Sequence, residues 1–129
     1  GAFLNWMYFS DATLTFPQTL VLRYSQLEPE ERRNPQVAGD YAKWFLGRLR
    51  AVEAATANGQ NLCAGRFTAA DIVNGYALRL AGNIGLAKDY GPNVAAYWAR
   101  LQEREGYQRA VAAERKAGVE QNVTPRVRA

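Results

Sequence analysis

Residues 67–72, in the middle of this chain, read Phe-Thr-Ala-Ala-Asp-Ile, which is the pattern of a capping box at the N-terminus of a helix. The hydroxyl of Thr68 can accept a hydrogen bond from a backbone N–H of the first helical turn, and Asp71 can accept one from the N–H of Thr68. Phe67 before the cap and Ile72 at the fourth helical position are spaced to form a hydrophobic staple. These residues predict the first turn of a buried helix, and Thr68→Ala or Asp71→Ala is expected to cost about 1–2 kcal/mol of stability.

The spacing of these two residues also decides between two roles for Asp71. A buried carboxylate can act as a general acid or base, but backbone donors at a helix start would occupy its oxygens. The sequence therefore favours Thr68 and Asp71 as a structural capping box and not as a catalytic pair.

Apolar residues recur at helical spacing along most of the chain, and no segment shows the alternation that is typical of a strand. Five helices are predicted, at residues 2–26, 35–57, 69–84, 92–104 and 107–117. Pro17 predicts a bend or break near Phe16, because proline lacks the backbone donor and crowds the preceding turn. The expected fold is an all-α helical bundle of about five helices over residues 1–117, followed by an extended or mobile tail over residues 118–129.

Glycines and aromatic residues within this pattern give further expectations. Gly59 is placed to take the left-handed conformation after the second helix. Gly75 and Gly82 each cost the third helix roughly 1 kcal/mol relative to alanine, so we expect a neighbouring helix to approach closely there. Five aromatic residues recur at helical spacing and are expected in the core: Tyr41, Trp44, Tyr76, Tyr97 and Trp98.

The composition excludes several classes of site. The chain has 129 residues, with 16 lysines and arginines, 12 aspartates and glutamates, and no histidine, for a formal net charge of +4. Without histidine, a Cys–His pair, a Ser–His–Asp triad and a histidine-based metal centre are impossible, and no metal is expected. The single cysteine, Cys63, lies between apolar neighbours and is expected to be structural, in a reducing compartment.

The positive charge predicts neither a nucleic-acid partner nor a membrane partner. Arginines alternate with acidic residues, which is typical of solvated helix faces and not of a dense basic surface. The adjacent Arg32 and Arg33 fall in a charged linker at residues 27–34 and are expected to be exposed. No run of about eighteen apolar residues is present, so no membrane span is predicted.

The candidate binding surface lies on the first helix. Tyr8, Asp11 and Thr15 follow one another at steps of three and four residues, which places a phenol, a carboxylate and a hydroxyl on one helical face. This mixture is suited to the half-polar wall of a ligand cleft. The alternative is ordinary exposure to solvent with Tyr8 partly packed, and the residues alone favour this alternative.

The amino-acid sequences of three segments resemble those of one protein family. Residues 65–72, Gly-Arg-Phe-Thr-Ala-Ala-Asp-Ile, followed by Tyr-Ala-Leu at 76–78, resemble the sixth helix of glutathione S-transferases. Pro92–Leu101 and Gly106–Ala110 resemble the seventh and eighth helices, although the family more often begins the latter with Arg-Pro-Xaa-Tyr. The resemblance covers residues 2–117 and is most specific at the capped helix.

The resemblance implies the C-terminal all-helical domain of a glutathione S-transferase. The full-length enzymes attach glutathione to electrophilic substrates in detoxification, and they are cytoplasmic homodimers that need no metal. Their activating Tyr, Ser or Cys belongs to a thioredoxin-like N-terminal domain that is absent from this chain. The resemblance therefore assigns no catalytic residue here, and it implies that the chain alone is inactive.

The family's binding contacts, carried onto this sequence, fall on the first helix. Tyr8 is nearest to the position that reaches glutathione across the dimer, and Asp11 and Thr15 are nearest to the wall of the electrophile site. The alternative is a non-enzymatic interaction or scaffold domain, because this fold also serves on translation factors, aminoacyl-tRNA synthetases and bacterial stress regulators. A third alternative is a stand-alone helical ligand carrier.

Overall fold

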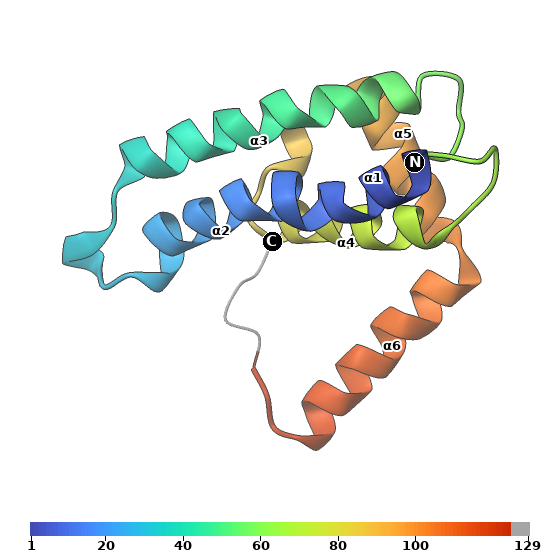
Figure 1. The fold of residues 1–129 in the computed structure, drawn as a ribbon. Helices are drawn as coiled ribbons and strands as arrows, with labels where there is room; N and C mark the ends of the chain where they lie inside the picture. Colours follow the sequence, from blue (N-terminus) through green and yellow to red (C-terminus); the bar gives the residue numbers. More distant parts are fainter. Residues whose placement is uncertain (125–129) are drawn as a thin grey trace.

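The computed structural model describes residues 1–124, which form six α-helices and no strand (Figure 1). The helices α1 (Ala2–Phe9) and α2 (Phe16–Leu22) are joined by the π-helical segment η1 (Ser10–Thr15). A second π-helical segment, η2 (Arg23–Leu27), extends α2. These four segments form one continuous rod, so the described residues contain the predicted all-α bundle of five helical units.

The irregularity predicted near Phe16 is present, but as a widened helix and not as a break. η1 ends two residues before Pro17, which lies in the first turn of α2 and lacks the N–H that would continue the hydrogen bonds of the rod. Within η1 the hydroxyl of Thr15 donates to the carbonyl oxygens of Ser10 and Asp11, at 3.2 and 3.1 Å. Because a π-helix has more residues per turn than an α-helix, side chains before and after η1 do not follow one 3.6-residue period.

The other helices begin and end close to the predicted residues. They are α3 (Pro35–Ala55), α4 (Ala69–Asn83), α5 (Pro92–Glu103) and α6 (Glu105–Glu120). Short 3₁₀ turns, η3 (Glu30–Arg32) and η4 (Ala87–Asp89), lie in the connections. Gly59 has a φ of 70°, as expected for the turn after the second predicted helix.

The last helix is longer than predicted. α6 continues through Gly118 and ends at Glu120, because the left-handed residue that closes it is Asn122, with a φ of 54°. The N–H of Val123 then donates to the carbonyl oxygen of Gly118, at 2.8 Å. Of the predicted tail, residues 125–129 lie outside the described residues.

The core lies between the rod, α3, α4 and α5. Leu14 of the rod, Phe45 of α3, Leu78 of α4 and Tyr97 of α5 are fully buried and pack in one cluster. Burial of each such apolar side chain is worth roughly 1.5–3 kcal/mol. α6 has no buried residue and projects away from the other helices (Figure 1). None of the helices in residues 1–124 has the length and apolar character to cross a bilayer.

The expected aromatic core is only partly correct. Tyr97 is fully buried and Trp98 packs against the core, but 45% of Trp44 and 56% of Tyr76 are exposed. The reason is that the two exposed rings lie on helix faces that border surface hollows and not on the faces turned to the core.

The predictions of close helix packing at Gly75 and Gly82 have different outcomes in the structure. At Gly75 an added Cβ would lie 3.0 Å from Leu101 Cδ1, so α5 does approach α4 closely there, as predicted. At Gly82 the nearest atom would be 3.9 Å away, which is ordinary contact, so the prediction is wrong at that position. Phe67 packs against the core and 59% of Ile72 is exposed, and the staple between them stays a prediction.

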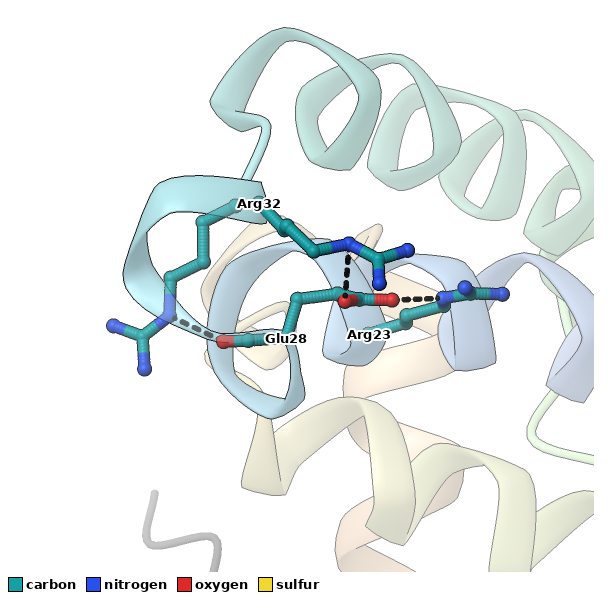
Figure 2. Close-up of polar contacts among 4 residues, drawn as sticks. Arg23, Glu28 and Arg32 are labelled. Carbon is teal, nitrogen blue, oxygen red and sulfur yellow. Dashed lines mark hydrogen bonds and ion pairs between the residues drawn. The ribbon is translucent and has the colours of Figure 1, made fainter.

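The predicted linker between the rod and α3 is held by one carboxylate (Figure 2). Glu28 pairs with the Nε of Arg23 at 2.7 Å and with the Nε of Arg32 at 3.2 Å, and its carbonyl oxygen accepts from Arg33 at 3.0 Å. The hydrogen bond from Arg23, and then the charge of Arg32, lower the pKa of Glu28 against an opposing effect of partial burial. Arg32 and Arg33 are exposed, as predicted, but both are bonded to Glu28.

Candidate functional site

A surface hollow of about 430 Å³ lies between the rod and α3, and we call it the α1–α3 hollow. Its volume is within the range of small-molecule sites. Its border includes part of η1, and π-helical turns occur frequently at functional sites. The lining residues are Phe9, Ala12, Thr13, Phe16, Pro17, Trp44, Gly47, Arg48 and Ala51.

Exposed aromatic rings form one side of the α1–α3 hollow. The rings of Phe16 and Trp44 meet edge to face with centroids 6.2 Å apart, and 52% of Phe16 and 45% of Trp44 are exposed. Tyr41 stacks on Trp44 at 5.5 Å, and the guanidinium of Arg48 lies 6.0 Å from the Trp44 ring centroid. A contiguous exposed aromatic surface of this kind is typical of an interaction site.

A second hollow, of about 410 Å³, lies between α4, α5 and α6, and we call it the α4–α6 hollow. Trp98 of α5 and Tyr107 of α6 meet edge to face at its wall, with ring centroids 5.4 Å apart. Arg79 of α4 pairs with Glu114 of α6 at 2.6 Å, and this hydrogen bond raises the pKa of Arg79. The lining residues are Phe67, Asp71, Ile72, Gly75, Tyr76, Arg79, Trp98, Leu101, Arg104, Gly106, Tyr107, Ala110 and Val111.

The structure does not bring the three predicted binding residues into one hollow. Tyr8 is 71% exposed and Asp11 is also exposed, and neither lines the α1–α3 or the α4–α6 hollow. Thr15 borders a third, smaller hollow of about 110 Å³, on the side of the rod that faces α4. η1 changes the helical period between Asp11 and Thr15, so the three residues do not follow a regular α-helical face.

Sequence reasoning missed the residues that border the α1–α3 hollow. The signal was nonetheless present, because Phe9 and Phe16 are seven residues apart, and Tyr41, Trp44 and Arg48 follow at steps of three and four. Tyr41 and Trp44 were expected in the core, and no role was assigned to Phe9, Phe16 or Arg48. Only the packing of the rod against α3 places them together at the surface.

Both halves of the capping box at the start of α4 are present. The hydroxyl of Thr68 accepts from the N–H of Ala70 at 3.2 Å, and Asp71 Oδ2 accepts from the N–H of Thr68 at 2.8 Å. Asp71 Oδ1 accepts from the N–H of Leu62 at 3.1 Å and from the hydroxyl of Tyr97 at 2.8 Å. The carboxylate is fully buried and both of its oxygens are bonded, so its role is structural.

Tyr97 and Cys63 lie beside the capping box. Burial, and then the hydrogen bond to Asp71, raise the pKa of Tyr97 well above its usual value. Cys63 is half-buried, with its Sγ 3.7 Å from the Thr68 hydroxyl oxygen, and is not in a disulfide. Within residues 1–124 there is no group of three or more acidic or cysteine side chains that could hold a metal ion.

Comparison with solved structures finds similarity to a glutathione transferase. No protein-family model matches the sequence, and no curated protein matches it. The crystal structure of the glutathione transferase URE2P5 from Phanerochaete chrysosporium matches 94% of this chain with a TM-score of 0.80, at 23% sequence identity. The match covers 56% of that chain, so this chain spans little more than half of its length. The fold is therefore the all-α fold of a glutathione transferase C-terminal domain.

Proposed function

Because the chain has the fold of the helical domain of glutathione transferases, we propose that it is the C-terminal domain of such an enzyme. Its full-length form would attach glutathione to electrophilic substrates. The main support is the structural match over 94% of the chain with a TM-score of 0.80. The start of α4 gives further support. The residues there resemble the family most specifically, and they form both hydrogen bonds of the capping box.

The proposed reaction is attack of the glutathione thiolate on an electrophilic carbon. A sulfur–carbon bond forms while the bond to the leaving group breaks, and the thiol proton passes to solvent. The thiolate needs a positioned donor that lowers its pKa, and we propose that a thioredoxin-like domain supplies this donor and most of the glutathione site. This chain is then inactive alone, and its part is to bind and orient the electrophile.

Within this proposal the first helix supplies the binding residues. Tyr8 contacts glutathione bound to the partner subunit, and Asp11 and Thr15 contribute to the wall of the electrophile site. The exposure of Tyr8 and Asp11 supports these roles, because both side chains are free to meet another domain or a ligand. Thr15 donates its hydroxyl proton within the rod, so it would offer a ligand only its methyl group and oxygen lone pairs.

We further propose that a second copy of the protein docks at the α1–α3 hollow, to give a cytoplasmic homodimer. Phe16 and Trp44 are exposed at this hollow. Aromatic residues are enriched at the centres of protein interfaces. The cysteine without a disulfide fits the reducing cytoplasm. The same exposed surface also favours the alternative function, a non-enzymatic scaffold domain that binds a different protein chain there.

Activity of the full-length polypeptide that contains residues 1–129 tests the proposal. We expect it to be retained on immobilised glutathione and to conjugate glutathione to 1-chloro-2,4-dinitrobenzene, which is followed by absorbance. The chain of residues 1–129 is the inactive control. Absence of both retention and turnover across several electrophile classes would favour the scaffold function, and turnover by the control chain would contradict the proposed division of roles.

Two substitutions test the assigned residues. Tyr8→Phe is expected to raise KM for glutathione, and Asp11→Asn to change KM for the electrophile, each with a smaller effect on the other substrate. Asp40→Asn on the exposed face of α3 is the matched control, because it removes a similar charge away from the first helix. If Asp11→Asn and Asp40→Asn change KM for the electrophile equally, Asp11 is not part of the electrophile site.

A further inference from the structure

Three buried polar side chains join the rod to α4, which lies beside it (Figure 1), and we call Ser10, Gln18 and Asn74 the polar seam. Ser10 Oγ donates to the carbonyl oxygen of Val73 at 2.8 Å, and Gln18 Nε2 donates to that of Ala77 at 2.9 Å. Asn74 donates in the opposite direction, from α4 to the rod. Because each side chain of the seam is at most 3% exposed, water does not compete for these bonds from the surface.

Asn74 uses both protons of its amide nitrogen. One goes to the carbonyl oxygen of Trp6 in α1 and the other to that of Ala70 in α4, each at 2.8 Å. Both partners can only accept, so the orientation of the amide is settled. Asn74 Oδ1 is buried and has no hydrogen-bond partner within residues 1–124. Asparagine is a poor helix former, and a buried oxygen without a donor costs stability, so the stability of α4 does not explain this residue.

A buried asparagine between helices has a second use, which is to fix their register. In coiled coils a single buried asparagine does so at a cost in stability. Apolar side chains attract one another without direction, whereas an amide hydrogen bond is lost when its partner moves out of line. A shift by one residue turns a helix by about 100° and moves it by about 1.5 Å. The bond from Asn74 to Trp6 therefore distinguishes one register of α1 on α4 from its neighbours.

The polar seam holds the rod on both sides of η1. Trp6 precedes η1 and Ser10 is its first residue, whereas Gln18 follows it in α2. A regular α-helix in place of η1 would have fewer residues per turn and would rotate α1 relative to α2. The bonds before and after η1 would then not fit α4 together. The polar seam thus favours the π-helical form of η1 and the orientation of α1 that goes with it.

We propose that Asn74, together with Ser10, is a positioning residue that fixes the register of α1 on α4 and so places Tyr8 for its contact with glutathione. The second half of this proposal rests on the proposed function. Tyr8 lies midway between Trp6 and Ser10, the two residues of the rod that are bonded to α4 before Gln18. The Tyr8 side chain is 71% exposed, so the backbone of α1, and not packing of the ring, determines where it lies.

Hydrogen exchange followed by mass spectrometry tests the register, on the full-length polypeptide that contains residues 1–129. Asn74→Leu replaces the amide by an apolar group with the same branching, and Ser10→Ala removes the hydroxyl. Each is expected to speed exchange of the amides in residues 2–15 about twofold to tenfold, the range for loss of one hydrogen bond. Gln18→Leu is the comparison within the polar seam, and it should speed exchange in residues 16–22 instead.

Steady-state kinetics of the same polypeptide tests the positioning of Tyr8. Asn74→Leu and Ser10→Ala are each expected to raise KM for glutathione about twofold to tenfold, with a smaller change in kcat. In a chain that carries Tyr8→Phe, Asn74→Leu should raise KM little further, because Asn74 acts through Tyr8. Tyr90→Phe is the matched control and should leave KM unchanged, because it removes a hydrogen bond to the α4 carbonyl of Leu78 from outside the rod.

Two results would overturn the proposal. Unchanged exchange in residues 2–15 of both Asn74→Leu and Ser10→Ala would show that their bonds do not hold α1. Equal rises in KM for Asn74→Leu and Tyr90→Phe would show general loss of stability and not a change in position. If Asn74→Leu does not fold, Ser10→Ala decides both points. If the unsubstituted protein does not use glutathione, the proposed function fails and the second half of this proposal with it, while the exchange experiment still decides the register.

Discussion

Truncation of the two capping residues at the start of α4 should have very different consequences. From their spacing alone, Thr68→Ala and Asp71→Ala are each expected to cost about 1–2 kcal/mol. In the structure Thr68 accepts from one N–H, that of Ala70, whereas Asp71 accepts from the N–H groups of Leu62 and Thr68 and from the hydroxyls of Thr68 and Tyr97. Removal of Asp71 therefore leaves three donors without their acceptor, the N–H groups of Leu62 and Thr68 and the hydroxyl of Tyr97, while the Thr68 hydroxyl still has Cys63 Sγ as a partner at 3.7 Å.

The structure gives the size of this difference. A buried donor that loses its partner costs about 1–3 kcal/mol, so the low end for three donors is about 3 kcal/mol. We expect Asp71→Ala to cost about 3–5 kcal/mol and Thr68→Ala about 1 kcal/mol. A loss of 3–5 kcal/mol is a large part of the 5–15 kcal/mol that is typical of a whole domain.

Urea unfolding followed by far-UV circular dichroism measures both variants. An unchanged m-value with a lower midpoint would show that stability and not the extent of unfolding has changed. Where Asp71→Ala is too unstable to measure, Asp71→Asn and Tyr97→Phe replace it, each with an expected loss of about 1–2 kcal/mol. In the Asp71→Asn background Tyr97→Phe should cost less, because the two residues share one hydrogen bond.

The refuting result is equal loss in the two alanine variants. If Asp71→Ala and Thr68→Ala agree within about 0.5 kcal/mol, the bonds from Leu62 and Tyr97 contribute nothing net, and the tertiary role of Asp71 is wrong. A loss below about 2 kcal/mol for Asp71→Ala would lead to the same conclusion, because water or local relaxation would then satisfy the three donors.

Three further substitutions and conditions give measurable changes. Gly91→Ala should cost about 0.5–2 kcal/mol of stability, because the new Cβ would lie 2.5 Å from Glu53 Oε2 and displace the carboxylate that caps α5. In urea unfolding, Gly91→Ala should cause little further loss of stability in a chain that already carries Glu53→Ala. Gly39→Ala should stabilise α3 by about 0.5–1 kcal/mol in the same assay, since nothing lies within 4 Å of the added Cβ. Above pH 10 the unfolding free energy should fall, because burial raises the pKa of Tyr97 and Tyr90 above the ordinary value of 10.0. Their contribution is complete below pH 10 and is lost as pH rises toward the folded pKa, with a slope of about 1.4 kcal/mol per pH unit for each tyrosine.

Controls separate these effects from general damage. Tyr97→Phe should remove one of the two alkaline contributions and leave that of Tyr90. Additive losses in Gly91→Ala and Glu53→Ala would show that the glycine matters for a reason other than the carboxylate. Destabilisation by Gly39→Ala would show that its helix face is covered in solution.

The fold was predictable because its determinants are local. The bounds of α4 follow from the cap at Thr68, and the turn after α3 follows from the left-handed Gly59. Gly75 was predictable too, since a glycine inside a central helix has few reasons other than close packing. Gly118, in contrast, was expected to end the last helix, and the left-handed Asn122 does so instead.

The candidate sites were less predictable because they depend on contacts between distant segments. Phe16 and Trp44 are both apolar residues at helical spacing, and nothing local distinguishes a core position from a surface one. The π-helical η1 likewise has no simple local signature, yet it changes the helical period over the stretch that contains Asp11 and Thr15. The proposed binding role of these three residues still depends on their place along the first helix.

The sequence by itself determined that this chain is helical, where its helices lie, and that no histidine chemistry is available, because period, caps and composition act within a few residues. The tertiary structure decided which helix faces remain uncovered and how many donors meet Asp71. Those properties depend on residues such as Leu62 and Tyr97, which are nine positions before Asp71 and 26 after it and become its neighbours only when the helices pack.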